Sequence, residues 1–148
     1  MTKTIYDAVG TTAPPQTLQL DRGRLRLFAK ATGQTDPVYF DLAAAKAAGY
    51  PDLLVPPTFL FGVDFEQPDP FAFYKEHNVN VTKLLHGSQS FEYLALAFAG
   101  DEIVSTPFVK AVYDKKGGTL TFVEREGTLT RSGELVAILK GTTVIRNV

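Results

Sequence analysis

The stretch Val55–Phe65, VPPTFLFGVDF, decides the fold that this sequence predicts. Pro57 suits the first turn of a helix, because a proline lacks the N–H that a first helical turn leaves unused. The apolar residues that follow would surround the helix on every side: Phe59, Leu60, Phe61, Val63 and Phe65. A helix that is apolar all round is buried. We therefore expect one short helix at the centre of the molecule.

Strand-like segments fill the second half of the chain, from residue 84 to residue 147. Turns that contain glycine separate them, which is typical of antiparallel hairpins in a meander: SQSFEYLALAFA (88–99), EIVSTPFVKAVY (102–113), TLTFVEREGTLT (119–130) and LVAILKGTTVIRN (135–147). Pro107 within its run predicts a bulge or an edge position. Long antiparallel strands after one apolar helix predict an α+β chain whose sheet curls around that helix, the hot-dog architecture.

Two further helices are predicted in the first half, and each has a start signal and a stop signal. Residues 22–32 carry apolar side chains with helical spacing, between Asp21 as N-cap and Gly33 as the stop. A second helix is expected over 42–48, between Asp41 and Gly49. Residues 71–78, FAFYKEHN, predict one more helical turn before the sheet.

Size and composition describe an ordinary globular domain. With 148 residues the chain is predicted to be one domain, residues 1–148, with an N-terminal arm (1–15) and a core (16–147). A net charge of −1 without a basic run argues against nucleic acid or an anionic membrane as partner. The absence of cysteine and the presence of only two histidines argue against a metal centre. No signal peptide is recognisable, so we expect the cytoplasm.

Six segments resemble the MaoC-like hydratases and dehydratases, in particular the N-terminal-half type among relatives of (R)-specific enoyl-thioester hydratases. They follow the family's order over residues 16–147: TGQTDPVYFD (32–41), AGYPDLLVPPTF (48–59), LLHGSQSFEY (84–93), AGDEIV (99–104), VYDKKGGTLTFVEREG (112–127) and SGELVA (132–137). The resemblance implies a hot-dog fold that pairs into a double hot dog. It also implies acyl thioesters of coenzyme A or an acyl carrier protein as substrates, water addition or its reverse as the reaction, and no cofactor.

The catalytic loop of the family reads Gly-Asp-x-Asn-Pro-(Ile/Val)-His-x-Asp, and this chain departs from it at the residues that move protons. Gly33, Pro37, Val38 and Asp41 match, whereas the three substituted positions hold Gln34, Asp36 and Tyr39. The carboxylate and the imidazole of the family hold and deprotonate water together. A glutamine cannot take a proton, and a phenol with a pKa near 10 is a poor base at neutral pH.

Two residues could compensate for the lost pair. Asp36 either caps the turn at Pro37, as an Asp before a proline usually does, or serves as a relocated base assisted by Tyr39. His86 is either a structural histidine at the start of a strand or a group that lines the thioester groove. His77, in a polar segment, is expected to be solvated.

The turn into the central helix is a candidate substrate-binding element. Pro57, Thr58 and Phe59 are either architectural or offer free N–H groups to the thioester carbonyl, since a helix start has spare donors. Lys115, Lys116 and Arg125 form either a solvated rim or a clamp for a phosphate of coenzyme A.

Three functions compete on these residues. In the first, the chain supports a catalytic MaoC-like partner that has an intact Asp and His. In the second, it is a self-sufficient homodimeric hydratase that uses Asp36 with Tyr39 or His86. In the third, it is a non-enzymatic acyl-thioester binding module. The substituted loop favours the first. The expected assembly is a homodimer or a heterodimer with another MaoC-like chain.

Overall fold

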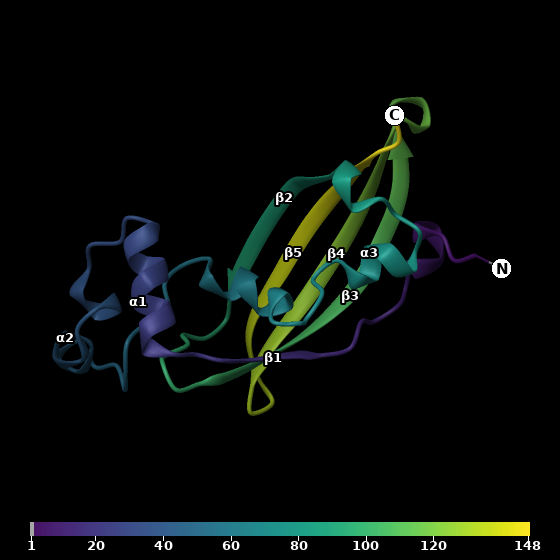
Figure 1. Cartoon of the computed structure of the whole chain (residues 1–148). Helices are drawn as coiled ribbons and strands as arrows, with labels where there is room; N and C mark the ends of the chain where they lie inside the picture. The colour runs from purple at the N-terminus through teal and green to yellow at the C-terminus, as the bar shows by residue number, and fades with distance from the viewer. Residues whose placement is uncertain (1) are drawn as a thin grey trace.

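The computed structural model describes residues 2–148. A five-stranded antiparallel sheet forms its body, with short helical segments over one face and at one end (Figure 1). None of the helices in this range is long and apolar enough to cross a bilayer. With η for 3-10 helices, the elements are η1 (Ile5–Ala8), β1 (Gln16–Gln19), α1 (Arg22–Ala31), η2 (Pro37–Tyr39), α2 (Leu42–Ala47), η3 (Phe59–Phe65), α3 (Ala72–Glu76), η4 (Val81–Lys83), β2 (Leu84–Tyr93), β3 (Glu102–Lys115), η5 (Lys116–Gly118), β4 (Leu120–Arg131) and β5 (Glu134–Arg146).

The strand order of the sheet is β1-β3-β4-β5-β2. The predicted hairpins are correct for β3, β4 and β5, but the prediction of a simple meander is wrong for β2. This strand pairs with β5, with Gln89 opposite Gly141, and forms the edge remote from β1. It also ends at Tyr93, so residues 94–99 leave the sheet to cross to β3. The short strand β1 was not predicted.

The central helix is present, but its type and burial differ from the prediction. The segment η3 is a 3-10 helix that starts at Phe59, after Thr58 with a left-handed φ of 70°, so Pro57 precedes the helix instead of opening it. Leu60 and Val63 lie three residues apart and share the buried face. Phe61 and Phe65 are 37% and 49% exposed, so only part of the helix surface is buried.

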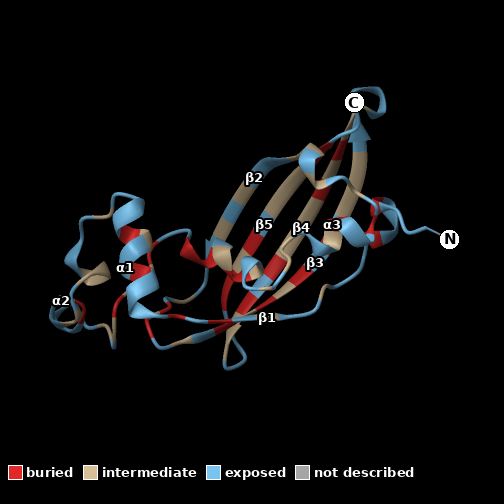
Figure 2. Cartoon of the chain, viewed as in Figure 1, coloured by how far each residue is buried: buried red, intermediate tan, exposed pale blue. Residues whose placement is uncertain are grey.

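The sheet curls around η3 and α3, which lie over the same face in Figure 1. This is the predicted α+β, hot-dog architecture. One buried cluster joins α1 and η3 to the sheet near β1, and a second joins η1 and α3 to the other end, as the red segments of Figure 2 show. The first contains the fully buried Leu25 and Leu53, and the second contains Tyr74 and Val123.

The helices α1 and α2 form where their end signals place them. The carboxylates of Asp21 and Asp41 accept hydrogen bonds from backbone N–H groups of the first turn, at 3.1 and 2.9 Å. Gly33 follows α1 with a φ of 77°, in the left-handed region that a glycine occupies without steric conflict. Gly33, which ends α1, and Asp41, which caps α2, therefore mark the two ends of the loop between these helices.

Pro107 lies on an outer edge of the sheet, as predicted. The pairing of β1 with β3 ends at Ser105, and beyond it β3 contacts the N-terminal segment, where Ala13 N–H donates to Pro107 O at 2.9 Å. The register of β3 shifts shortly afterwards, between Val109 and Ala111. The missing N–H of the proline thus interrupts no ladder.

Ion pairs tie α1 to the rest of the domain, and they predict acid sensitivity. Arg24 donates to Glu66 at 2.6 Å, and this hydrogen bond holds the pKa of Glu66 below its ordinary value. Arg22 does the same for Asp52. A carboxyl with a lowered pKa in the folded state stabilises the fold above its unfolded pKa, about 4, and loses that contribution as the pH falls through the folded pKa.

The variant Arg24→Met is expected to show this effect. At pH 7 it should lower the free energy of unfolding by less than about 1 kcal/mol, because the pair is partly exposed. Below about pH 4 the difference from the parent chain should shrink, since Glu66 becomes protonated in both proteins. Urea titrations followed by circular dichroism at pH 7 and pH 3 measure both differences. An equal difference at the two pH values would contradict this assignment.

Candidate functional site

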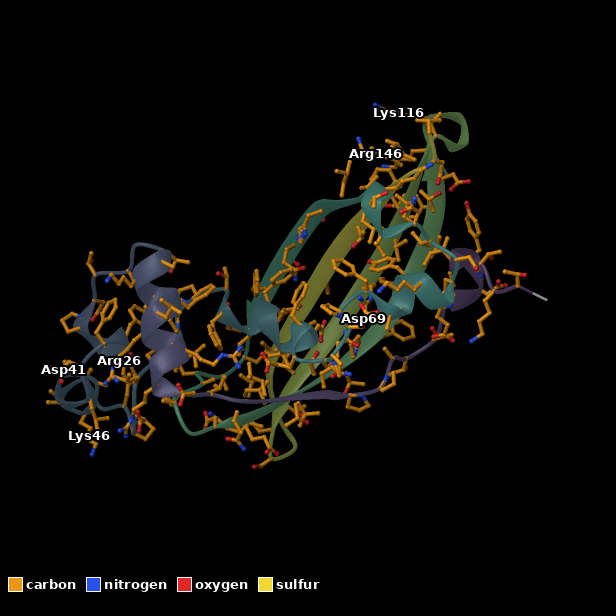
Figure 3. All side chains as sticks on the ribbon, viewed as in Figure 1. Arg26, Asp41, Lys46, Asp69, Lys116 and Arg146 are labelled. Atoms are coloured by element: carbon orange, nitrogen blue, oxygen red, sulfur yellow. The ribbon has the colours of Figure 1, made fainter. Side chains whose placement is uncertain are left out.

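The substituted loop, residues 33–41, lies at the α1–α2 end of the molecule, where Figure 3 labels Arg26 and Asp41. Figure 3 also shows that this end is well separated from Asp69, beside α3 over the sheet. Three hydrogen bonds anchor the backbone of the loop: Gln34 N to Ala29 O (2.9 Å), Leu54 N to Val38 O (3.1 Å) and Arg26 Nε to Phe40 O (2.8 Å). The loop is thus held to α1 and to the segment that leads into η3.

Of the three substituted side chains in this loop, Asp36 has a structural role. The exposed carboxylate of Asp36 accepts a hydrogen bond from Val38 N–H at 3.1 Å and caps η2. Tyr39 is half-buried, and burial, followed by the negative charge of Asp36, raises the pKa of its phenol. A higher pKa makes Tyr39 an even poorer base at neutral pH. Gln34 is half-buried and carries no charge.

A groove of about 440 Å³ lies between the helical layer and the sheet. Its wall is largely apolar and is formed by Leu60, Phe61, Phe65, Phe71 and Tyr74. Its polar lining includes Asp64, whose carboxylate accepts a hydrogen bond from the buried Ser105 hydroxyl at 2.7 Å. The volume is within the range of small-molecule sites. None of the three substituted loop residues lines this groove.

The two histidines differ in outcome: His86 follows one of its two predicted alternatives, and His77 does not follow its prediction. His86 on β2 is exposed, packs edge-on against Phe61 with 5.4 Å between ring centroids, and lines the groove. His77 is buried and its Nδ1 lies 2.8 Å from Phe73 O, so the expectation that it is solvated is wrong. Within residues 2–148 neither imidazole is hydrogen-bonded to a carboxylate.

The N–H groups at the start of η3 already have partners. Thr58 N–H donates to the Tyr93 hydroxyl at 2.9 Å, and Phe59 N–H donates to Pro56 O at 3.2 Å. The Phe59 ring packs edge-on against Phe28 in the core. The expected free donor at Thr58 is therefore occupied by a phenol from β2. Burial raises the pKa of this phenol, which stays protonated at neutral pH.

The family of the chain follows from its sequence. A family model described as FAS1-like, dehydratase domain region, matches residues 7–139. The chain belongs to this FAS1-like dehydratase family. A UPF0336 protein of Streptomyces griseus is 33% identical over 129 residues, which cover 86% of this chain and 85% of the relative.

Solved structures confirm the hot-dog fold of this FAS1-like dehydratase domain. The truncated HadBC complex of Mycobacterium tuberculosis, a (3R)-hydroxyacyl-ACP dehydratase, matches with a TM-score of 0.77 and 24% identity over 93% of this chain and 97% of that chain. A MaoC-like dehydratase matches with a TM-score of 0.80 and 23% identity. That match covers 94% of this chain but 42% of the other, which is more than twice as long as the matched region.

The three basic residues that the sequence predicts as a rim or a phosphate clamp, Lys115, Lys116 and Arg125, do not form one cluster in this FAS1-like domain. The Lys115 amino group lies over the Phe122 ring at 4.9 Å, and Lys116 is exposed at the turn after β3. Arg125 lines the groove, so the prediction of a solvated rim is wrong for this residue. The sequence of β4 contained a signal for this position. Residues 123, 127 and 129 alternate with the same phase as Arg125 and are buried, so Arg125 faces the covered side of the strand.

Proposed function

We propose that this chain is the supporting subunit of an acyl-thioester hydratase or dehydratase. It would supply an acyl-binding groove and a subunit interface to a second MaoC-like chain, and that chain would supply the carboxylate and the imidazole. The observation that carries the proposal is the loop at residues 33–41, whose backbone is hydrogen-bonded to α1 and to the segment before η3, whereas Asp36 caps η2 and the phenol of Tyr39 has a raised pKa. Such a loop lacks the carboxylate and imidazole pair that would hold and deprotonate water.

The groove beside η3 supports the substrate class. It offers an apolar wall long enough to involve both η3 and α3, as an acyl chain requires. The solved relative with a similar fold is named a (3R)-hydroxyacyl-ACP dehydratase. We therefore propose an acyl chain, carried on coenzyme A or an acyl carrier protein, as the ligand of the groove.

The edge strand β2 supports the existence of a partner. Within residues 2–148 its outer row of N–H and C=O groups faces no other strand. Apolar side chains are exposed along and just beyond it, at Leu85, Tyr93, Leu94 and Leu96. An open edge beside exposed apolar side chains suits pairing with a second sheet. The HadBC relative is likewise named a complex. We propose that β2 joins the sheet of the catalytic chain.

Mixing the two subunits tests this proposal. The purified chain should show no hydration of crotonyl-coenzyme A by itself, and it should co-elute with a MaoC-like chain of the same genome that has the intact Asp and His loop. The rate of the mixture should exceed the sum of the separate rates. Sustained turnover by this chain alone, in a preparation free of homologues, would overturn the proposal.

A further inference from the structure

Arg125 is a basic side chain without a hydrogen-bonding partner inside the groove. Its Nε is fully buried and has no hydrogen-bond partner among residues 2–148. The ion pairs among the described residues do not include it. The guanidinium stacks instead under the ring of Phe73 on α3, with 4.7 Å from Cζ to the ring centroid. A buried donor without an acceptor is destabilising, and native proteins rarely retain one without a reason.

The neighbours of Arg125 across the sheet are small or polar. Arg125, Gly141 and Gln89 lie opposite one another on β4, β5 and β2, so they form one row across the floor of the groove. Gly141 has no side chain, and Gln89 folds over it, with its Oε1 only 2.6 Å from the position that a Cβ of Gly141 would occupy. Gly127, two residues along β4, also lines the groove. The floor is thus polar at Arg125, opposite the apolar wall, and the Gln89 amide occupies the space above Gly141.

We propose that Arg125 selects acyl chains that carry an uncharged oxygen, such as a hydroxyl or keto group, over plain alkyl chains. The inference rests on the proposed acyl-binding function and adds a specificity determinant to it. An oxygen acceptor in the groove would accept a hydrogen bond from the Nη groups of the guanidinium, which have no hydrogen-bond partner among residues 2–148, whereas a methylene would leave them unpaired. An uncharged oxygen fits better than a carboxylate, because Asp64 and Glu126 also line the groove and would repel an anion.

Binding measurements on the full chain test this selectivity. The probes are decanoyl-coenzyme A, its analogues with a hydroxyl on carbon 6, 8 or 10, and decanedioyl-coenzyme A, each titrated by calorimetry. At least one hydroxylated analogue should bind about tenfold more tightly than decanoyl-coenzyme A, because a hydrogen bond to a charged donor replaces an unpaired one. The diacid should bind less tightly than that analogue. A tighter diacid, or equal affinity for plain and hydroxylated chains, would overturn the selectivity.

The matched variants are Arg125→Met and Arg125→Lys. Met keeps an unbranched side chain that can pack against Phe73 but has no donor, so the variant should bind plain and hydroxylated chains with equal affinity. Lys keeps the charge without the planar fork of donors and should lose most of the selectivity. A preference for the hydroxyl that survives in both variants would refute the role of Arg125. Thermal unfolding curves verify that each variant is folded.

A groove-filling variant separates this inference from the proposed function. A Cβ at Gly127 would lie 3.6 Å from Ser105 Oγ and 3.7 Å from Leu129 Cδ1, which are ordinary contacts, so Gly127→Val should fold. It should weaken every acyl ligand about equally. If the parent chain binds none of the probes, the acyl-binding role and the selectivity both fail. If it binds them all equally and Gly127→Val abolishes binding, only the selectivity fails.

Discussion

In the assembled pair, an Asp→Asn substitution in the catalytic loop of the partner chain should lower kcat by about 10²–10⁴-fold, the usual contribution of general acid–base catalysis. The substitution Asp36→Asn in this chain should change kcat by less than about threefold. The contrast follows from the geometry of Asp36, whose exposed carboxylate caps η2 and lies outside the groove. Crotonyl-coenzyme A hydration by the two reconstituted complexes measures both effects.

Asparagine is an informative replacement at residue 36 because it preserves the cap. Its amide oxygen can still accept the hydrogen bond from Val38 N–H, so the substitution removes only the capacity to exchange a proton. Tyr39→Phe serves as a control that removes the neighbouring hydroxyl. A loss of a hundredfold or more with Asp36→Asn, together with turnover by the chain alone, would instead identify a self-sufficient homodimer.

The second large effect concerns stability, and α1 provides both the test and its control. Leu25 and Leu27 lie two residues apart on this helix, but Leu25 is 0% exposed in the main core whereas Leu27 is 70% exposed. Leu25→Ala should lower the free energy of unfolding by about 3–5 kcal/mol, since it removes transfer energy and leaves a cavity. Leu27→Ala should change it by less than about 0.5 kcal/mol.

Urea titrations at pH 7, followed by circular dichroism, compare the two leucine variants with the parent chain. The helix propensity of alanine is similar at both positions, so the difference between the variants isolates burial. Equal losses in the two variants would mean that α1 is not packed on the core as described. Such an outcome would also remove the support that α1 gives to the loop at residues 33–41.

The elements that the sequence predicts well are those with local signals. The helix α1 carries an aspartate cap and a glycine stop, and its predicted range, 22–32, differs by one residue from Arg22–Ala31. The prediction for α2 is equally close, because Asp41 and Gly49 delimit it. Caps and stops act within one or two turns, so they can be read without knowing the rest of the fold.

What failed depends on contacts that are remote along the chain. The partner of β2 is β5, about fifty residues away, and no pattern within either strand records that pairing. The residues of β1 are too few and too polar to show alternation. The buried state of His77 comes from a hydrogen bond to Phe73 and from packing under it, while its sequence neighbours are polar. The polar sequence neighbours of His77 therefore led to a wrong prediction of its burial.

The candidate site also contains features that local sequence signals predict and features that depend on remote contacts. The substitutions at Gln34, Asp36 and Tyr39 are visible in the sequence, because the surrounding loop resembles the family's pattern. The capping of η2 by Asp36 was one of two alternatives there, and the structure contains this hydrogen bond. The partner of Thr58 N–H could not be predicted, because it comes from Tyr93 on another element.

The edge strand β2 has a practical consequence for producing this protein. It spans ten residues, and its only irregularity is the register shift at Gly87, where a side chain would collide with Thr142 O. A single bulge bends such an edge but does not shield it from a like strand of another copy. Recombinant chain made without a companion should therefore precipitate as its concentration rises, and co-expression with the companion should raise the soluble yield.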